Sequence, residues 1–365
     1  MLSRKTFDVL NQVYKAPGCS ERDISGACKL DSSVISSALA ELRKDSLIEG
    51  ESLVITPQGL ETLVPFRVKN AIIMAAGLSS RLAPISYEQP KGLLKVCGEV
   101  LIERQIRQLK EAGIDDIVVV VGYMKEKFYY LEDLYGVTIV FNPEYAQRNN
   151  NSTLYAARDR LDNTYICSSD NYFTENPFET YVYSAYYSCV YFEGKTDEYV
   201  PKTKGEELLI VGVDYDGGDD WGTLGHAYFD REFSRKFVKF LEQDYSQPET
   251  AGKYWEDVYL DHVSELPMVA RHYPGGVVWE FDNLDEFKAF DSQFLENVDS
   301  VAFDDICSTL GCTRNQVENI EPIKDDSTSP SFRFAVDGVD YVYRYSSADA
   351  SEDVVCRDSI QPAVV

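Results

Sequence analysis

A glycine and two cations near residue 80 form the part of the sequence best suited to binding phosphate. Residues Ala71–Ala76 are a continuous apolar run, as expected of a buried strand, and Gly77 follows directly. A glycine there lets the chain turn so that successive amides face an anion, while Arg81 and Lys91 supply positive charge for further phosphate oxygens. Neither a Walker A pattern nor the dinucleotide GxGxxG pattern occurs. We predict a nucleotide triphosphate site; the alternative is an ordinary surface loop.

Two aspartates follow apolar stretches at distant points of the chain. Asp170 comes after Tyr165–Ser168, and Asp282 ends an aromatic stretch that begins at Val277. Acidic side chains at the carboxyl ends of strands can meet at one edge of an open sheet. Such a pair suits Mg²⁺, which accepts one or two protein carboxylates in addition to phosphate oxygens. The alternative for each aspartate is a strand-end cap or a solvated acid.

The overall charge excludes some classes of ligand. The 365 residues include 35 basic and 61 acidic ones, a net charge of −26. Such a chain repels phosphate backbones at long range, so we do not expect nucleic acid as its main ligand. The eight cysteines and three histidines have no zinc-binding spacing. No signal-peptide pattern and no run of membrane-spanning length is present, so we expect a cytoplasmic protein with reduced thiols and no membrane insertion.

Strand-like and helix-like segments alternate from residue 68 onward, which is typical of an open α/β sheet. We expect strands at 71–76, 117–121, 137–140 and 165–168, helices at 101–111, 125–131 and 152–161, and a closing strand and helix at 277–282 and 284–290. In such a sheet, ligands bind at the carboxyl ends of the strands.

The first 66 residues are similar to a winged helix-turn-helix domain, with residues 31–42 as its recognition helix. Ser20 with Asp23, and then Asp31, have the character of helix starts, and short apolar pieces follow at 47–48 and 53–55. The segment carries a net charge of −2, and the recognition helix has no basic residue before Arg43. DNA binding is therefore unlikely for residues 1–66, although it stays open; the alternative is a protein-contact or regulatory module.

The middle of the chain, about residues 68–295, resembles the sugar-phosphate nucleotidyltransferases, and among them the bacterial CTP:phosphocholine cytidylyltransferases. The resemblance begins with Met74-Ala-Ala-Gly-Leu-Ser-Ser-Arg and Gln89-Pro-Lys. Five further landmarks follow in order: Asn149-Asn-Asn-Ser-Thr-Leu-Tyr, Ser168-Ser-Asp-Asn-Tyr-Phe, Lys195-Thr-Asp-Glu-Tyr, Tyr254-Trp-Glu-Asp-Val-Tyr and Trp279-Glu-Phe-Asp-Asn-Leu-Asp. The resemblance implies a Rossmann-like open mixed sheet (α/β), preceded by the small winged helix-turn-helix domain, with domains at 1–66, 67–297 and 298–365.

The resemblance also implies a reaction, Mg²⁺-dependent cytidylyl transfer from CTP to phosphocholine, and a role for each matching residue. The expected catalytic residues are Arg81, Lys91, Asp170 and Asp282, of which the two aspartates hold the metal. Nucleotide binding is expected of Ala75, Ala76, Gly77, Leu78, Ser79, Ser80, Arg81, Lys91, Asn150 and Ser169. Acceptor binding is expected of Asn171, Tyr199, Tyr254, Trp255, Asp257 and Glu280.

A quaternary ammonium group such as that of choline is recognised by aromatic faces and nearby carboxylates. Trp255 has this chemistry, because Tyr254, Tyr259 and two acids surround it in sequence. Tyr199 stands where the family is expected to carry tryptophan. With 25 tyrosines and 18 phenylalanines in the chain, a chance cluster of aromatic and acidic residues is the alternative.

Two other functions stay open at this point. One is the same chemistry on 2-aminoethylphosphonate or a sugar 1-phosphate, and the other is a nucleotide-sensing winged-helix transcription regulator.

The last segment is predicted to form a β-hairpin, with strands at 332–336 and 341–344 joined by Asp337-Gly338. It is similar to the opening strands of choline kinases, without the catalytic aspartates, so we expect a remnant, or the truncated end of a fused kinase, with no kinase activity. A homo-oligomer is left open.

Overall fold

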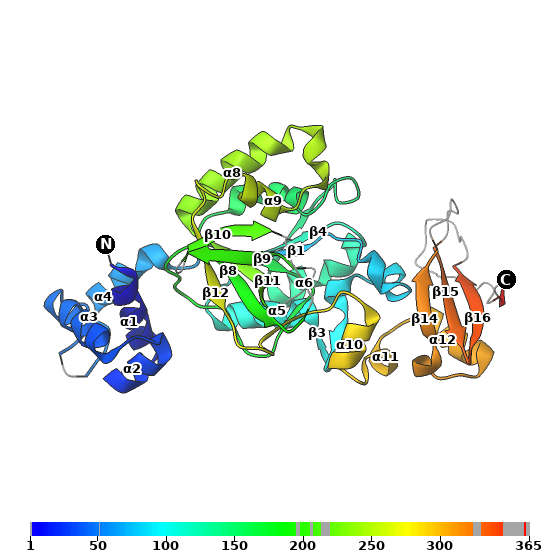
Figure 1. Ribbon diagram of the computed structural model, residues 1–365, viewed down its shortest axis with the longest axis horizontal. Helices are drawn as coiled ribbons and strands as arrows, with labels where there is room; N and C mark the ends of the chain where they lie inside the picture. The colour runs from blue at the N-terminus through cyan, green and yellow to red at the C-terminus, as the bar shows by residue number, and fades with distance from the viewer. Residues whose placement is uncertain are drawn as a thin grey trace.

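Three units follow one another along the long axis of the computed structural model (Figure 1). The structure describes residues 2–50, 52–194, 198–204, 207–212, 220–323, 330–345 and 361–362. A helical N-terminal unit comes first, a large α/β unit occupies the middle, and a small unit of strands and one helix lies at the far end.

The central unit is built on a mixed nine-stranded sheet in the order β5-β4-β1-β6-β11-β8-β12-β10-β9. β1 runs parallel to β4 and β6, whereas β11 is antiparallel to both β6 and β8. This confirms the predicted α/β fold with an open mixed sheet. Its strands are β1 (Asn70–Ala75), β4 (Ile117–Val121), β5 (Thr138–Phe141), β6 (Thr164–Ser168), β8 (Tyr186–Phe192), β9 (Val200–Lys204), β10 (Glu207–Gly212), β11 (Asp220–Phe229) and β12 (Met268–His272).

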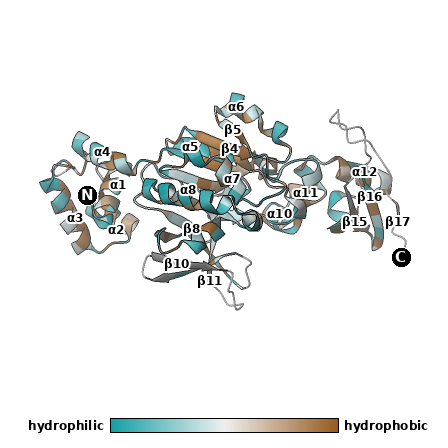
Figure 2. Cartoon of the chain, turned by 90° about the horizontal axis from the view of Figure 1, so that it is seen from above, coloured by the Kyte–Doolittle hydropathy of each residue, from teal (hydrophilic) through white to brown (hydrophobic). Residues whose placement is uncertain are grey.

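Helices cover both faces of this sheet because its central strands are apolar on both sides. Figure 2 shows brown, hydrophobic strands lying between helices with teal outer surfaces. One face packs against α5 and α6, and the other against α7, α8 and α9. The bounds are α5 (Leu101–Glu111), α6 (Tyr130–Tyr135), α7 (Asn151–Ala156), α8 (Arg231–Tyr245) and α9 (Trp255–Asp261).

Most predicted elements are confirmed, but the helix predicted at 125–131 lies further along the chain, and the helix predicted at 152–161 is shorter than expected. Residues 125–128 form a 3-10 turn before α6, and the helix expected at 152–161 is α7 followed by a 3-10 turn at 158–160. Gly136 has a left-handed backbone, with φ of 66°, and ends α6 at Tyr135, four residues beyond the predicted end. Asn151, Ser152 and Thr153 are weak helix formers, which fits the short length of α7.

The N-terminal unit consists of α1 (Arg4–Lys15), α2 (Glu21–Cys28), α3 (Ser32–Lys44) and α4 (Pro57–Leu63). Ser20 and Asp23 cap α2 reciprocally, as the sequence indicates. The short apolar pieces at 47–48 and 53–55 pair through an antiparallel bridge between Ile48 and Ile55. The unit packs on the central one through the rings of Phe7, Phe66 and Tyr183.

The C-terminal unit contains the predicted hairpin and shares a core with the central unit. Its sheet has the order β14-β15-β16-β17. A single apolar cluster joins this sheet to the α10–α12 region and to residues that follow β1. The remaining elements are β2 (Lys95–Val96), β3 (Glu99–Val100), β7 (Asn171–Phe173), β13 (Val278–Glu280), β14 (Glu318–Pro322), β15 (Ser331–Val336), β16 (Val339–Arg344), β17 (Gln361–Pro362), α10 (Leu284–Phe290), α11 (Phe294–Asn297) and α12 (Val301–Leu310).

None of the helices in the described ranges combines the length and the apolar character needed to span a lipid bilayer. Seven cysteines lie in the described part of the chain, and all of them are free thiols.

Candidate active site

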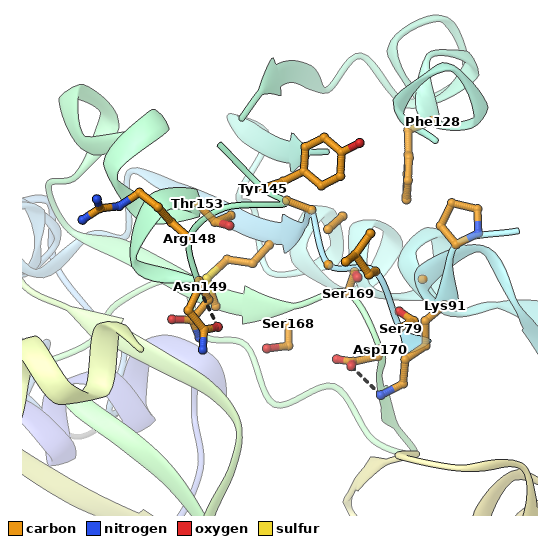
Figure 3. A pocket seen from close by; sticks show the side chains of 18 residues that line it. Ser79, Lys91, Phe128, Tyr145, Arg148, Asn149, Thr153, Ser168, Ser169 and Asp170 are labelled. Atoms are coloured by element: carbon orange, nitrogen blue, oxygen red, sulfur yellow. Dashed lines mark hydrogen bonds and ion pairs between the residues drawn. The ribbon is translucent and has the colours of Figure 1, made fainter. Parts of the chain in front are cut away.

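The segment after β1 borders a cavity of about 310 Å³ at the carboxyl edge of the sheet (Figure 3). The walls are contributed by the ends of β1 and β6, by Lys91 and Gly92, and by the start of α7. A side chain at position 92 would lie within 2.8 Å of Ser169, so glycine is needed where these two loops approach each other. Of the predicted nucleotide-binding residues, those that line the cavity are Ala75, Ala76, Gly77, Leu78, Ser79, Lys91, Asn150 and Ser169.

The four predicted catalytic residues lie together at the mouth of this cavity. The Lys91 Nζ atom is 2.6 Å from Asp170 Oδ2 and 3.7 Å from Asp282 Oδ1. Arg81 Nη1 lies 3.0 Å from Asp282 Oδ2. Lys91 is buried, whereas the Arg81 side chain is 73% exposed and does not line the cavity. One buried ammonium thus bridges carboxylates that are separated by more than 100 residues of sequence.

The charge state of Lys91 follows from this arrangement. Burial by itself would lower the pKa of its ammonium, but Asp170, Glu280 and Asp282 outweigh burial and raise that pKa above the ordinary value. Lys91 is therefore charged at neutral pH and is available to a phosphate. Figure 3 shows its side chain directed at Asp170.

The two aspartates fit a magnesium ion in their donor chemistry. Asp170 Oδ1 is buried and has no hydrogen-bond partner among the residues that the structure describes, which leaves this carboxylate oxygen available to a cation. No group of three or more His, Cys, Asp or Glu side chains arranged for a metal occurs among the described residues. An ion here would have two carboxylates and would complete its shell with phosphate oxygens and water, as Mg²⁺ commonly does.

Two glutamates make the region beyond the aspartates strongly acidic. Glu280 Oε2 accepts a hydrogen bond of 3.0 Å from Asn171 Nδ2, and β13 pairs with β7 at these two residues. Burial and the neighbouring Asp170 raise the pKa of Glu280 well above its usual range. Burial, with Asp282 and Asp170, raises the pKa of Glu198 to about 7. A cationic ligand would relieve the repulsion among these carboxylates.

Trp255 does not form the exposed aromatic wall that the sequence predicts. Its side chain is 2% exposed and packs in the core, with its ring centroid 5.2 Å from Tyr187 and 5.3 Å from Phe229. The prediction fails because Trp255 begins α9 on the side that faces α8 and the sheet. Its backbone amide donates a 2.7 Å hydrogen bond to Asn150 Oδ1, so α9 is attached to the wall of the cavity.

The other predicted acceptor residues near α9 are more accessible. Tyr254 is 46% exposed, and the Tyr199 hydroxyl donates a 3.3 Å hydrogen bond to Asp257 Oδ1. The Tyr254 amide donates to the second oxygen of the same carboxylate. Residues Lys195–Asp197, part of one landmark, lie outside the described residues, as does the side chain of Ser80.

The structure adds candidates that sequence reasoning missed. Arg148 lines the first cavity, although Figure 3 shows its side chain directed away from Lys91; Asn149, which begins a quoted landmark, lines the same cavity. A second cavity, of about 890 Å³, is lined by Trp279, Tyr191, Phe290 and the carboxylates Glu198, Glu280 and Asp282. Glu198 and Trp279 both stand inside the quoted landmarks, so their motifs carried a signal; Tyr191 and Phe290 had none.

Comparison with known proteins identifies the class to which the chain belongs. Residues 71–209 match the MobA-like NTP transferase domain family. The chain is 35% identical over 227 residues to a choline-phosphate cytidylyltransferase of Streptococcus pneumoniae, covering 62% of this chain and 98% of the relative. It is also 35% identical over 230 residues to a 2-aminoethylphosphonate cytidylyltransferase of Lancefieldella rimae, covering 62% of this chain and 93% of that relative.

Solved structures show the same relationship. The structure of the CTP:phosphocholine cytidylyltransferase from Streptococcus pneumoniae aligns with a TM-score of 0.59 at 35% identity, over 62% of this chain and 98% of that one. A structure from Bacillus anthracis, described as a putative glucose-1-phosphate thymidylyltransferase, aligns with a TM-score of 0.51 at 15% identity. The alignment covers 64% of this chain and 97% of that one, and it shows a shared fold. The fold and the site define a nucleotidyltransferase. Within that class, the chain belongs to the family that includes the choline-phosphate and 2-aminoethylphosphonate cytidylyltransferases.

Proposed function

We propose that this protein transfers a cytidylyl group from CTP to phosphocholine and releases pyrophosphate. The observation that carries the proposal is the bridge of Lys91 between Asp170 and Asp282 at the mouth of the cavity after β1. The choice of CTP is supported by two relatives that are cytidylyltransferases and that match over nearly their whole length.

The reaction needs positioning and charge neutralisation rather than a base. A phosphate oxygen of phosphocholine attacks the α-phosphorus of CTP, a new P–O bond forms, and the bond to the pyrophosphate oxygen breaks on the opposite side. That attacking oxygen is already ionised at pH 7. We assign Lys91 to the α-phosphate or the incoming phosphate. Arg81 and the amides from Gly77 to Ser80 hold the leaving pyrophosphate.

We propose Asp170 and Asp282 as the ligands of a magnesium ion. When bound, Mg²⁺ would neutralise phosphate charge beside Lys91. The unpartnered Oδ1 atom of Asp170 supports this role.

We propose that the choline headgroup binds in the acidic region beside the two aspartates, where Glu280 accepts a hydrogen bond from Asn171. The resemblance points to Tyr199, Tyr254 and Asp257 as the aromatic and acidic partners, and Trp255 supports them from the core. The second cavity offers Trp279 as another aromatic face next to Glu280. Aromatic faces and carboxylates together suit a cation that donates no hydrogen bond.

A pyrophosphate-release assay with Mg²⁺ tests the proposal. CTP, UTP, ATP and GTP are each combined with phosphocholine, phosphoethanolamine, 2-aminoethylphosphonate and glucose 1-phosphate. Turnover with CTP and phosphocholine is the expected result. The second candidate is turnover with 2-aminoethylphosphonate, which the equally similar relative from Lancefieldella rimae favours. Nucleotide binding without turnover for any pair would instead indicate a nucleotide sensor.

We further propose that the N-terminal unit is a winged helix that acts as a contact module in a cytoplasmic protein. The order of three helices, a short bridge and α4 supports this interpretation. We propose that the β15–β16 hairpin is a kinase-like remnant without kinase activity. ATP-dependent phosphorylation of choline by the purified chain would contradict the second proposal.

A further inference from the structure

The loop that carries the catalytic cations packs against the C-terminal unit. Leu82, Ile85 and Leu94 are buried in the same apolar cluster as residues of α12 and of the β15–β16 hairpin. Arg81 precedes this stretch directly, and Lys91 lies within it. Phe281, between Glu280 and Asp282, belongs to the cluster as well. One core therefore supports both the cations and the acids of the site.

Polar contacts join the same parts at Glu88. Its carboxylate accepts hydrogen bonds from the amides of Val301, at 2.8 Å, and Ala302, at 2.9 Å, in the first turn of α12. It also accepts a 2.8 Å hydrogen bond from the hydroxyl of Tyr345, a buried residue that directly follows β16. The Gln89 side chain donates a 3.0 Å hydrogen bond to the carbonyl of Asp299. Glu88 and Gln89 stand three and two residues before Lys91.

We propose that Glu88 and Tyr345 are positioning residues, through which the C-terminal unit holds the loop from Arg81 to Lys91 in the conformation that binds the nucleotide triphosphate. The inference rests on the proposed function of that loop. It gives the C-terminal unit a role in this chain that does not depend on its origin as a kinase-like remnant.

Such a positioning role would change the KM for the nucleotide more than kcat. If the loop holds the competent conformation for only part of the time, the apparent affinity for the triphosphate falls in proportion to that fraction. Saturating nucleotide restores the competent form, so kcat is nearly unchanged. A variant in which a fraction of the molecules is unfolded and inactive behaves differently: its apparent kcat falls, and its KM for the nucleotide is unchanged.

The test compares two tyrosines. Tyr345→Phe removes the hydroxyl that reaches Glu88, whereas Tyr343→Phe removes one that donates a 3.0 Å hydrogen bond to Asp305 inside the C-terminal unit. Both side chains are buried in the same cluster. For the nucleotide that supports turnover, we expect Tyr345→Phe to raise KM by about 3- to 10-fold, with kcat within about twofold. We expect Tyr343→Phe to leave the nucleotide KM at the wild-type value.

A second readout does not depend on activity. Amide hydrogen exchange of residues 82–94 in the protein without nucleotide should speed up in Tyr345→Phe and in Glu88→Gln, and not in Tyr343→Phe. Unchanged exchange and unchanged nucleotide KM in both loop variants would overturn the inference, as would a lower kcat at an unchanged KM. If no nucleotide and acceptor pair gives turnover, the proposed function fails while the exchange result still decides whether the C-terminal unit holds the loop.

Discussion

Lys91 and Asp170 illustrate how few side chains are needed for this chemistry. The buried ammonium remains charged because Asp170, Glu280 and Asp282 lie near it. Within the described part of the chain, one Asp170 oxygen has no hydrogen-bond partner. Separately, a lysine after Pro90 and an aspartate after a strand are unremarkable residues. Together they provide a site that can neutralise the charge of a triphosphate.

Replacing Asp170 by asparagine should therefore abolish most of the activity. The change removes one metal-binding carboxylate, and we expect kcat to fall by at least about 100-fold in a pyrophosphate-release assay. Asp282 stays close to Lys91, so the melting temperature should change little. Asp285→Asn is the control, because its carboxylate pairs only with exposed Lys288 on α10 among the described contacts. Near wild-type turnover of Asp170→Asn would contradict the metal role.

The buried side chain of Glu256, in the first turn of α9, should make the free energy of unfolding depend on pH. Burial raises its pKa from an ordinary 4.5 to about 7, so between these values the native state holds a proton that the unfolded chain has lost. The stability from this proton is fully present below pH 4.5 and is lost as pH rises through 7. Glu256→Gln cannot ionise, so it should be more stable than wild type at pH 8, by up to about 3 kcal/mol, with little or no gain at pH 4. Thermal unfolding at both pH values measures this, and the same gain at both would refute it.

At the scale of the element, α9 separates two neighbouring aromatic residues into different roles. The helix begins at Trp255, whose ring faces the core, while Tyr254 precedes it and remains exposed. Adjacent residues at a helix start point in different directions, so the sequence cluster does not form a single wall.

This separation predicts different effects of two substitutions. Trp255→Ala should lower the free energy of unfolding by about 3–5 kcal/mol, because it empties a packed site. Tyr254→Ala should leave the melting temperature nearly unchanged and raise the KM for phosphocholine several-fold. Trp279→Ala, assayed in parallel, reports on the second cavity. If Trp279→Ala alone raised the acceptor KM, the headgroup would be assigned there rather than beside α9.

At the scale of the whole molecule, charge and docking both argue against a DNA-binding role. The net charge is −26, and the ion pair of Lys15 with Glu179 attaches the N-terminal unit to the central one, within which Glu179 also pairs with Arg271. We expect no binding to a random duplex at about 150 mM salt and about 10 µM protein, with or without CTP, because long-range repulsion outweighs contacts from α3. Fluorescence anisotropy of a labelled duplex measures this; CTP-dependent binding would support a regulator instead.

The sequence by itself determined the class of fold and most of the residues at the mouth of the cavity. Buried strands alternate with amphipathic helices locally, and the glycine loop with Arg81 and Lys91 needs only neighbouring residues to be recognised. Those features depend on short-range periodicity and on residue type, which a sequence displays directly.

Tertiary structure decided the rest, because burial and distance depend on segments far apart in the chain. Only packing placed Trp255 in the core, brought Asp282 within reach of both Lys91 and Arg81, and set Glu88 against α12. The assembled core, rather than the local pattern, sets the direction in which a side chain at a helix start faces. It also sets which residue, more than 200 positions later, contacts a loop.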